Sequence, residues 1–273
     1  MVVGKNRYFI WWMALLLGMV FLVSGCAEQV AMTESKKHPT IVIGSDRFEP
    51  YIYLGDNGEF MGVDVELAKE ALHRMGYEAK FKAIVWEHKN DYLKNGTIDC
   101  LWGCFSMNGR EELYQWAGPY LYSNQTVAVR RDSGIYKLRD LTGKTVAVQE
   151  TGKAEEYFLH SQDDAAPQVE KVYAFSRMDK VYSALRKNYV DAIAGHENAL
   201  HMLIVTAPNR YRMLEEPLFS SKVGVAFRKD YDPVFVKQLD DTLKQMMQDG
   251  TTLRIVEKYG LDGKKALSGE KGL

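Results

Sequence analysis

The sequence contains few cysteines and no excess of basic charge. Three cysteines among 273 residues exclude a disulfide-rich scaffold. Lysine and arginine together number 35 against 36 aspartates and glutamates, which gives a formal net charge of −1. Binding to nucleic-acid phosphates needs a concentrated basic surface, so no nucleic-acid partner is expected.

The amino terminus is the most apolar part of the chain. Lys5 and Arg7 precede an uncharged stretch over residues 8–22, and small residues followed by Cys26 close it. This layout is typical of a signal peptide over residues 1–25, and its end resembles a bacterial lipobox, in which the cysteine becomes the lipid-anchored first residue. The alternative, an uncleaved transmembrane anchor, normally needs about 20 apolar residues, and this run is shorter. Both interpretations place the remainder of the chain outside the cytoplasm.

The segment after the predicted signal peptide is polar. Residues 26–38 lack periodicity, which predicts a flexible tether before a folded part that begins near Pro39. Without residues 1–25 the net charge becomes about −3, because Lys5 and Arg7 are removed. The remaining length is enough for one large domain or for two lobes with separate cores.

Cys100 and Cys104 are the two cysteines outside the amino terminus. They are predicted to lie in a strand and in the loop after it. Residues four apart on an extended strand are about 13 Å apart, which is too far for a disulfide. Free thiols are therefore expected, and a turn at Gly103 is the alternative that would permit a bridge.

Short runs rich in valine and isoleucine alternate with helical patterns, which is the signal of an α/β fold. In the first helix apolar residues recur at helical spacing from Val65, with Asp64 expected as the N-cap and Gly76 as a left-handed cap. The predicted strands are 40–44, 79–85, 98–102, 145–149, 169–173 and 190–194, and the predicted helices are 64–75, 87–95, 153–161, 178–188, 233–248 and 251–259.

Two further β-like runs, 125–130 and 222–228, each lead into a polar step. They are interpreted as paired crossover strands between two α/β lobes. The predicted first lobe comprises residues 39–128 and 222–273, and the second comprises residues 129–221. The predicted fold class is therefore α/β, with two lobes joined by two crossover strands and a ligand cleft between them.

An ordered series of short motifs resembles the family 3 extracellular solute-binding proteins, which have the type II periplasmic-binding fold. Each motif alone is weak, and their order and spacing over residues 40–262 make the resemblance specific. The motifs are Ile43-Gly-Ser-Asp46 with Pro50-Tyr51, Gly62-Val-Asp-Val-Glu-Leu-Ala68, Gly96-Thr-Ile-Asp99, Arg110 with Gly118-Pro-Tyr120, Leu141-Thr-Gly-Lys-Thr-Val146, Ala154-Glu-Glu-Tyr157, Val190-Asp-Ala-Ile193 and Asp249-Gly-Thr251.

The resemblance implies a lipid-anchored protein on the extracellular face of the cell membrane, which is the periplasmic side where an outer membrane exists. Such a protein binds an amino acid or a related small carboxylate, closes by hinge motion and delivers its ligand to an ABC permease in the membrane. No cofactor is expected. The alternatives are a sensor that feeds a membrane receptor and a cleft lyase or dehydratase.

The resemblance assigns the carboxylate of the ligand to Arg110, because a guanidinium fork pairs with a carboxylate bidentately. A surface arginine paired with Glu111 or Glu112 is the alternative. Relatives carry a small hydroxyl residue two positions after Gly103. This chain has Phe105 there, so only the backbone donor remains.

Aromatic residues of the first lobe are further candidates. Asp46 and Phe48 match positions that touch the ligand side chain in relatives. With Tyr51 they suggest an aromatic box that favours a flat or cationic group. Trp86 and Trp102 match cleft positions of the resemblance, and core packing is the alternative for Tyr51 and Trp86.

The second lobe departs most from its relatives. Gln149-Glu-Thr151-Gly152-Lys153 stands where relatives have Gly-Thr-Thr. The following helix N-terminus still offers free N–H groups to an anion, and an inward-facing Lys153 would add a positive charge.

The family's ammonium-binding aspartate is replaced by His196. Glu197 taking over, a ligand without an α-ammonium, and a neutral His196 that accepts a hydrogen bond all remain open. A more anionic solute would also suit His196 together with Arg110 and Lys153. The pair His196 and Glu197 is the acid and base that the lyase alternative would need.

Two further motifs suggest metal binding and phosphate binding, but the spacing of their residues fits neither kind of site. His196 and His201 are five residues apart, so their rings are turned about 140° from each other on a helix, and no metal site is expected. Gly143-Lys144-Thr145 resembles part of a phosphate loop, but Leu138 stands where the first glycine is needed.

Overall fold

The computed structural model describes residues 38–161 and 166–268. The predicted signal peptide 1–25, Cys26 and almost all of the predicted tether 26–38 lie outside the described residues. Within the described residues, no helix is both long and apolar enough to cross a membrane.

A nine-stranded mixed sheet forms the centre of the fold, in the order β4-β1-β5-β11-β6-β9-β7-β8, with β10 paired to β6. A separate hairpin is made by β2 and β3. The strands are β1 (Thr40–Ser45), β2 (Tyr53–Leu54), β3 (Phe60–Met61), β4 (Glu78–Ala83), β5 (Cys100–Leu101), β6 (Gln115–Arg130), β7 (Thr145–Gln149), β8 (Lys171–Phe175), β9 (Ala192–His196), β10 (Tyr211–Met213) and β11 (Phe219–Phe227).

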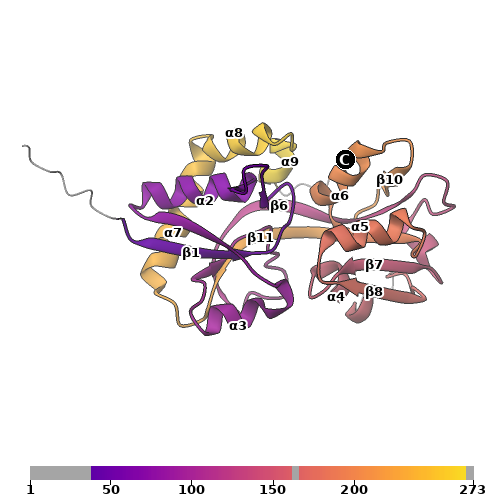
Figure 1. Ribbon diagram of the computed structural model, residues 1–273, viewed down its shortest axis with the longest axis horizontal. Coiled ribbons are helices and arrows are strands. Elements are labelled where there is room, and N and C mark those ends of the chain that lie inside the picture. The colour runs from indigo at the N-terminus through magenta and orange to yellow at the C-terminus, as the bar shows by residue number, and fades with distance from the viewer. Residues whose placement is uncertain (1–37, 162–165, 269–273) are drawn as a thin grey trace, which may run out of the picture. The chain divides into compact units, whose positions relative to one another are not determined.

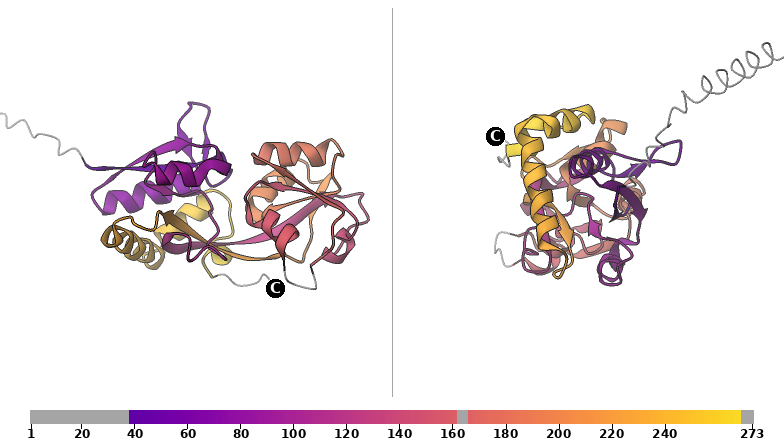
Figure 2. Two further views of the ribbon diagram at one scale, coloured as in Figure 1. Left: turned by 90° about the horizontal axis from the view of Figure 1, so that it is seen from below. Right: turned by 90° about the vertical axis from the view of Figure 1, so that its left-hand side faces the viewer.

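Helices cover the sheet at both ends (Figures 1 and 2). The α-helices are α2 (Val63–Arg74), α3 (Lys89–Lys94), α4 (Lys153–His160), α5 (Met178–Arg186), α6 (Glu197–Thr206), α7 (Pro233–Gln248), α8 (Thr251–Lys258) and α9 (Gly263–Ser268), and the 3-10 helices are η1 (Trp86–His88) and η2 (Leu138–Leu141).

The sheet has two parallel ends joined by an antiparallel pair. In the first lobe β1 pairs in parallel with β4 and β5, and in the second lobe β7 pairs in parallel with β8 and β9. Between them β6 and β11 pair antiparallel, and both strands run from one lobe to the other (Figure 1). The predicted fold class of two α/β lobes with two crossover strands is therefore confirmed.

The crossover strands are longer than the sequence predicted, and β6 pairs with two different strands along its length. Residues 115–125 of β6 pair with β11, whereas residues 125–129 pair with β9. The predicted run 125–130 therefore lies in the sheet of the second lobe, and the part of β6 that pairs with the other crossover strand is residues 115–125.

Helix α2 buries the apolar stripe that its periodicity predicts. Val65, Ala68 and Leu72 are fully buried, and Gly76 has a φ of 78° at the end of the helix. The expectation that Asp64 caps this helix is wrong. Gly62 holds the N-cap position, and the Asp64 carboxylate instead accepts a hydrogen bond from the Cys104 N–H at 2.7 Å.

Most predicted elements are confirmed with shifts of up to two residues at their ends. The strand 145–149 and the helix 233–248 match in full, whereas β8 and β9 begin and end two residues later than predicted. The strand over 98–102 shortens to β5. Helices α6 and α9 and the strands β2, β3 and β10 were not predicted.

The two cysteines after the amino terminus are both buried and free. Cys104 has a φ of 51°, so the chain turns sharply just after Gly103 without forming a bridge. The expectation of free thiols agrees with the structure.

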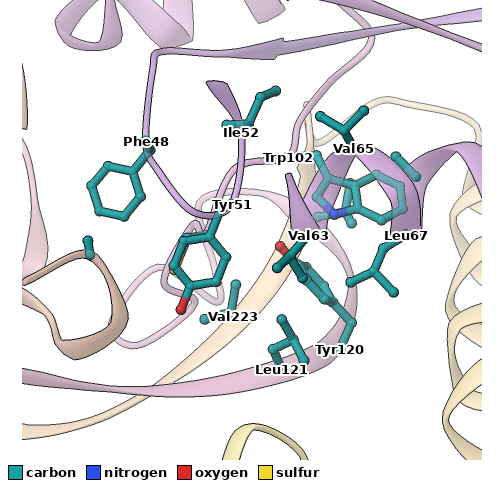
Figure 3. Packing of buried hydrophobic residues seen from close by; sticks show 14 of the residues in the cluster. Phe48, Tyr51, Ile52, Val63, Val65, Leu67, Trp102, Tyr120, Leu121 and Val223 are labelled. Carbon is teal, nitrogen blue, oxygen red and sulfur yellow. The ribbon is translucent and has the colours of Figure 1, made fainter. Parts of the chain in front are cut away.

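Figure 3 shows part of the hydrophobic core of the first lobe. Trp102 packs there against Tyr120, with ring centroids 5.7 Å apart, and lies beside Val65 and Leu67 of α2. Phe48 lies at the opposite side of this cluster. The aromatic residues of the first lobe therefore divide into core residues and residues that reach the cleft.

Candidate functional site

A cavity lies between the two lobes, and its empty space together with the solvent at its mouth measures about 480 Å³. Its walls come from loops that follow strand ends in both lobes, together with the start of α4. The lining residues are Asp46, Phe48, Trp86, Gly103, Cys104, Phe105, Ser106, Arg110, Gln125, Gln149, Thr151, Gly152, Lys153, Ala154, Met178, Ala194, Gly195 and His196.

Arg110 reaches from the first lobe to the second. Its side chain is only 12% exposed, and its guanidinium donates to the backbone carbonyl of Ser106 at 3.3 Å and to that of Thr151 at 3.0 Å. The guanidinium carbon lies 5.1 Å from the ring centroid of Phe105. Burial lowers the pKa of Arg110, although the group remains a cation. Arg110 thus presents a buried positive charge whose hydrogen-bonded acceptors are neutral.

Phe105 contributes a packing surface instead of the hydroxyl that relatives carry. Its ring meets Trp86 edge to face at 5.1 Å and lies near Tyr114 and Trp116. This aromatic cluster supports the planar face of Arg110, so the replacement orients the guanidinium through stacking.

The second lobe presents the N-terminus of α4 to the cavity. Lys153 is 10% exposed on its side chain and pairs with Glu156 at 2.5 Å. Thr151 has a left-handed φ of 57°, and its N–H donates to Glu155 at 2.6 Å. The helix start thus brings Lys153 next to Arg110, while Glu155 and Glu156 already accept hydrogen bonds from the Thr151 N–H and from Lys153.

The polar groups around His196 are neutral. His196 is buried, and burial, with a further contribution from the Arg110 charge, lowers its pKa to about 3. Its Nε2 lies 3.4 Å from the Ser106 hydroxyl, whereas its buried Nδ1 has no partner among the described residues. Gln125, which pairs with His196 between β6 and β9, also lines the cavity. This part of the cavity wall therefore offers hydrogen-bonding groups without charge.

Asp46 joins the two lobes. Its carboxylate accepts a hydrogen bond from Gln149 Nε2 at 2.5 Å. Burial raises the pKa of Asp46 to about 6, while the hydrogen bond from Gln149 opposes this shift. The site thus holds one carboxylate that stays mostly ionised at pH 7 but is protonated more easily than an ordinary aspartate.

Gly103 is required by close packing behind the cavity. A Cβ atom at this position would lie 2.0 Å from the Ser45 hydroxyl oxygen, which no side chain can accommodate. The next residue, Cys104, lines the cavity floor, and burial raises the pKa of its thiol well above the ordinary value. Its thiol is therefore not an activated nucleophile.

Eleven of the fourteen residues predicted for the site line the cavity. Tyr51, Trp102 and Glu197 do not. Tyr51 lies beneath it and accepts a hydrogen bond from Asn198 at 2.9 Å, and Trp102 belongs to the core. Glu197 pairs with Lys265 at 2.7 Å, so the pair of Glu197 and His196 considered for proton transfer is not assembled in the cavity.

Sequence reasoning missed several neutral residues and one cation. Ser106, Gln125 and Met178 line the cavity but stand in no motif. Lys89 is buried and donates to the Thr151 hydroxyl at 2.8 Å across the cleft. A lysine in a polar segment ordinarily indicates a solvated helix face, so only the folded chain reveals it.

Metal chemistry finds no support in the part of the chain that the structure describes. No group of three or more histidine, cysteine, aspartate or glutamate side chains is arranged to hold a metal ion there. His201 is exposed on α6, whereas His196 is buried at the end of β9. The two histidines therefore do not converge.

Comparison with known proteins agrees with this architecture. The L-cystine-binding protein of Escherichia coli strain K12 is 26% identical over 250 residues, which covers 90% of this chain and 91% of that protein. The arginine-binding extracellular protein of Bacillus subtilis strain 168 is 25% identical over 262 residues, covering 91% and 97%. The crystal structure of Tv2483 bound to L-arginine is similar with a TM-score of 0.74 and 26% identity, covering 81% of this chain and 90% of that one.

A family description also matches most of the chain. The profile of the bacterial extracellular solute-binding proteins, family 3, matches residues 41–262. This range contains the crossover strands, both lobes and every residue that lines the cavity. The chain therefore belongs to the bacterial extracellular solute-binding proteins, family 3.

Proposed function

We propose that the chain is the extracellular substrate-binding lipoprotein of an ABC-type importer and that it binds an amino acid or a related small carboxylate. The observation that carries this proposal is Arg110, a buried cation in the interlobe cavity whose hydrogen-bond acceptors are backbone carbonyls. A ligand carboxylate would give this guanidinium a bidentate partner, whereas the carboxylate of Glu156 lies 3.7 Å away and is 44% exposed. Similar proteins that bind cystine and arginine support the same ligand class.

The charged and the neutral residues of the cavity would receive different parts of the ligand. Arg110, Thr151 and Gly152 would hold the carboxylate, with Lys153 adding positive charge. His196 would remain neutral at pH 7 because its pKa is lowered to about 3, and its free Nδ1 would accept a hydrogen bond from an ammonium or hydroxyl group. The cavity-lining residues predicted from the sequence are the proposed ligand contacts, namely Asp46, Phe48, Trp86, Gly103, Phe105, Arg110, Gln149, Thr151, Gly152, Lys153 and His196.

Binding would be coupled to movement of the lobes. Gln149 contacts Asp46, and Asn198 contacts Tyr51, so hydrogen bonds already join the lobes around the cavity. A ligand that contacts both walls shifts the population towards the closed form. We propose residues 39–128 with 222–273 and residues 129–221 as the two units that move.

The proposed anchor is a lipid on Cys26. Residues 1–25 would be removed as a signal peptide, and the lipidated cysteine would keep the binding domain at the extracellular face of the membrane. Cys26→Ser should release the protein from the membrane fraction into the medium or periplasm. Retention of that variant in the membrane fraction would contradict the lipoprotein proposal.

The proposed binding function can be tested by thermal unfolding with a panel of amino acids and small carboxylates. A ligand at 100 times its dissociation constant adds about 2.7 kcal/mol of stability, which corresponds to an increase in Tm of roughly 5 to 10 °C for a domain of this size. Arg110→Ala should abolish the increase. Arg139→Ala, which removes an exposed arginine in η2, is the matched control and should preserve it.

Two outcomes would contradict the proposal. The first is a panel in which no amino acid or carboxylate raises the Tm. The second is a ligand-induced increase that Arg110→Ala leaves intact, because the carboxylate would then bind elsewhere. Turnover of a bound compound into a product would favour the enzymatic alternative.

A further inference from the structure

Lys89 is a buried cation beside the cavity. It begins α3, its residue is 5% exposed, and its Nζ lies 5.0 Å from the ring centroid of Trp86. The same Nζ donates to Thr151 Oγ1 in the opposite lobe at 2.8 Å. Trp86 and Thr151 both line the cavity, whereas Lys89 lines an adjoining, more open pocket that shares Arg110 and Thr151 with it. The ammonium therefore lies just outside the cavity.

This ammonium has no carboxylate partner. Among the ion pairs found within residues 38–161 and 166–268, none includes Lys89, and its one hydrogen bond there goes to a neutral hydroxyl. An ammonium carries three donors, so two of them remain available. Burying a cation without an anion costs several kcal/mol, and an anion at this place would remove that cost.

Arg110 also lacks a close carboxylate partner, and it binds the same residue as Lys89. Its guanidinium donates to the Thr151 carbonyl, while Lys89 donates to the Thr151 hydroxyl. The carboxylate that pairs with Arg110 is that of Glu156 at 3.7 Å, and it is 44% exposed and already paired with Lys153. Two cations of the first lobe therefore converge on neutral oxygen atoms of one residue.

The acidic groups near Lys89 accept hydrogen bonds from other residues or are partly exposed. Asp46 is bound by Gln149, and Glu155 is bound by the Thr151 N–H. Glu150 is partly exposed. Burial, followed by repulsion from Arg110, lowers the pKa of Lys89 to about 8, although Asp46, Glu155 and Glu150 oppose this. Asp46, Glu155 and Glu150 therefore act on the Lys89 charge from a distance, and among the described residues no carboxylate forms a direct ion pair with its ammonium.

We propose that Lys89 and Arg110 form a dicationic anion site and that the natural ligand carries a second acidic group in addition to the carboxylate bound by Arg110. This inference rests on the proposed function and narrows its ligand class to dicarboxylic compounds, such as α-amino acids with an acidic side chain. The Lys89–Thr151 hydrogen bond also brings the two lobes together, so an anion bound there stabilises the closed form.

The test is calorimetric titration with acids and their amides, which differ in charge but scarcely in shape. The pairs are L-glutamate with L-glutamine and L-aspartate with L-asparagine, together with glutarate as a dicarboxylate without an ammonium group. In the wild-type protein at least one acid should bind tenfold or more tightly than its amide. Lys89→Met keeps much of the apolar stem, and it should reduce that ratio to near one.

Two variants separate charge from other effects. Lys89→Gln retains a hydrogen-bond donor without the charge and should lose the preference for the acid as Lys89→Met does. Lys94→Met removes an exposed lysine from the same helix and should leave the ratio unchanged. If Lys89→Gln keeps the full preference, the hydrogen bond and not the charge is responsible, and the inference is overturned.

Failure of this inference is distinguishable from failure of the proposed function. Glutamine, asparagine or a cationic amino acid binding as tightly as the acids would support an amino-acid-binding protein and overturn the role of Lys89. Glutarate binding without any amino acid binding would support Lys89 and exclude amino acids as the ligand. Absence of all binding by the wild-type protein would overturn both.

Discussion

In each lobe a carboxylate accepts a hydrogen bond from the backbone N–H of a residue that lines the cavity. The two carboxylates differ in how deeply they are buried. In the first lobe Cys104 has a φ of 51°, and its N–H donates to Asp64 at 2.7 Å. In the second lobe Thr151 has a φ of 57°, and its N–H donates to Glu155 at 2.6 Å. The left-handed conformation costs a residue other than glycine about 1–2 kcal/mol. In both lobes a carboxylate offsets this strain at the cavity wall.

The difference lies in where each carboxylate is held. Asp64 is 1% exposed and belongs to α2, forty residues before Cys104. Glu155 is partly exposed and follows Thr151 by four residues in the first turn of α4. Water can replace a partly exposed local carboxylate, but it cannot replace a buried distant one. The comparison indicates a first-lobe loop fixed by tertiary structure and a second-lobe loop that adapts more readily.

The largest expected effect comes from removing the buried carboxylate. Asp64→Ala leaves the Cys104 N–H buried without an acceptor, which costs about 1–3 kcal/mol, and it also leaves a small cavity. We expect a loss of about 3 kcal/mol in the free energy of unfolding, measured by denaturant titration at pH 6. Asp56→Ala, in an exposed loop, should change it by less than about 0.5 kcal/mol. A loss of that small size in Asp64→Ala would show that the loop does not depend on Asp64.

A slightly smaller change in the free energy of unfolding is expected from the titration of Asp64. Burial raises the pKa of Asp64 to about 7, against an ordinary value of 3.8, although the Cys104 hydrogen bond opposes the shift. The folded state therefore holds this proton more tightly than the unfolded state, and the free energy of unfolding falls as pH rises from about 4 to about 7.

Asp64→Asn isolates this contribution because the amide oxygen can still accept from Cys104 but cannot titrate. Relative to that variant, the wild-type protein should lose about 2 kcal/mol between pH 5 and pH 7, at 1.36 kcal/mol per unit of pKa. Asp46, whose pKa is also raised, is present in both proteins and cancels. Denaturation curves that keep a constant difference across this range would contradict the assignment.

The same contrast explains which features could be predicted from the sequence. Local periodicity was sufficient for β7 and α7, because their apolar residues recur at strand or helix spacing. It misassigned Asp64 as a cap, because a polar residue before an apolar run gives the same signal whether it caps the helix or contacts a distant loop. The contact with Cys104 exists only after α2 and the loop after β5 come together.

The candidate site likewise contains residues that the sequence could identify and residues that it could not. Arg110 could be found because it stands within an ordered motif series, whereas Lys89 stands in a segment whose polarity indicates solvent. Trp102 and Phe48 are both aromatic and near strand ends, but only the folded chain shows that Trp102 faces α2 and Phe48 reaches the cleft. Side-chain direction at a strand end depends on tertiary packing, which spacing alone does not specify.

A smaller effect is expected from relieving strain in the second lobe. Thr151 is β-branched, and such residues are rare at positive φ, whereas asparagine tolerates this region and can offer an oxygen to Lys89. Thr151→Asn should therefore raise the free energy of unfolding by about 0.5–1 kcal/mol. Thr142→Asn, at an exposed threonine with a φ of −55°, should produce no gain. Destabilisation of Thr151→Asn would mean that the threonine side chain contributes more than its conformation costs.

The smallest effect on stability should come from Glu155, and it completes the comparison of the lobes. Glu155→Ala removes the acceptor for the Thr151 N–H, but this group lies near solvent, so water replaces the carboxylate. We expect a loss below about 1 kcal/mol, several times smaller than that of Asp64→Ala, with Glu215→Ala at an exposed site as the control. Ligand affinity should respond more than stability, because Thr151 contacts Arg110 and Lys89 and a less ordered turn misplaces both contacts. Equal losses of stability in Asp64→Ala and Glu155→Ala would remove the distinction between a fixed loop and an adaptable one.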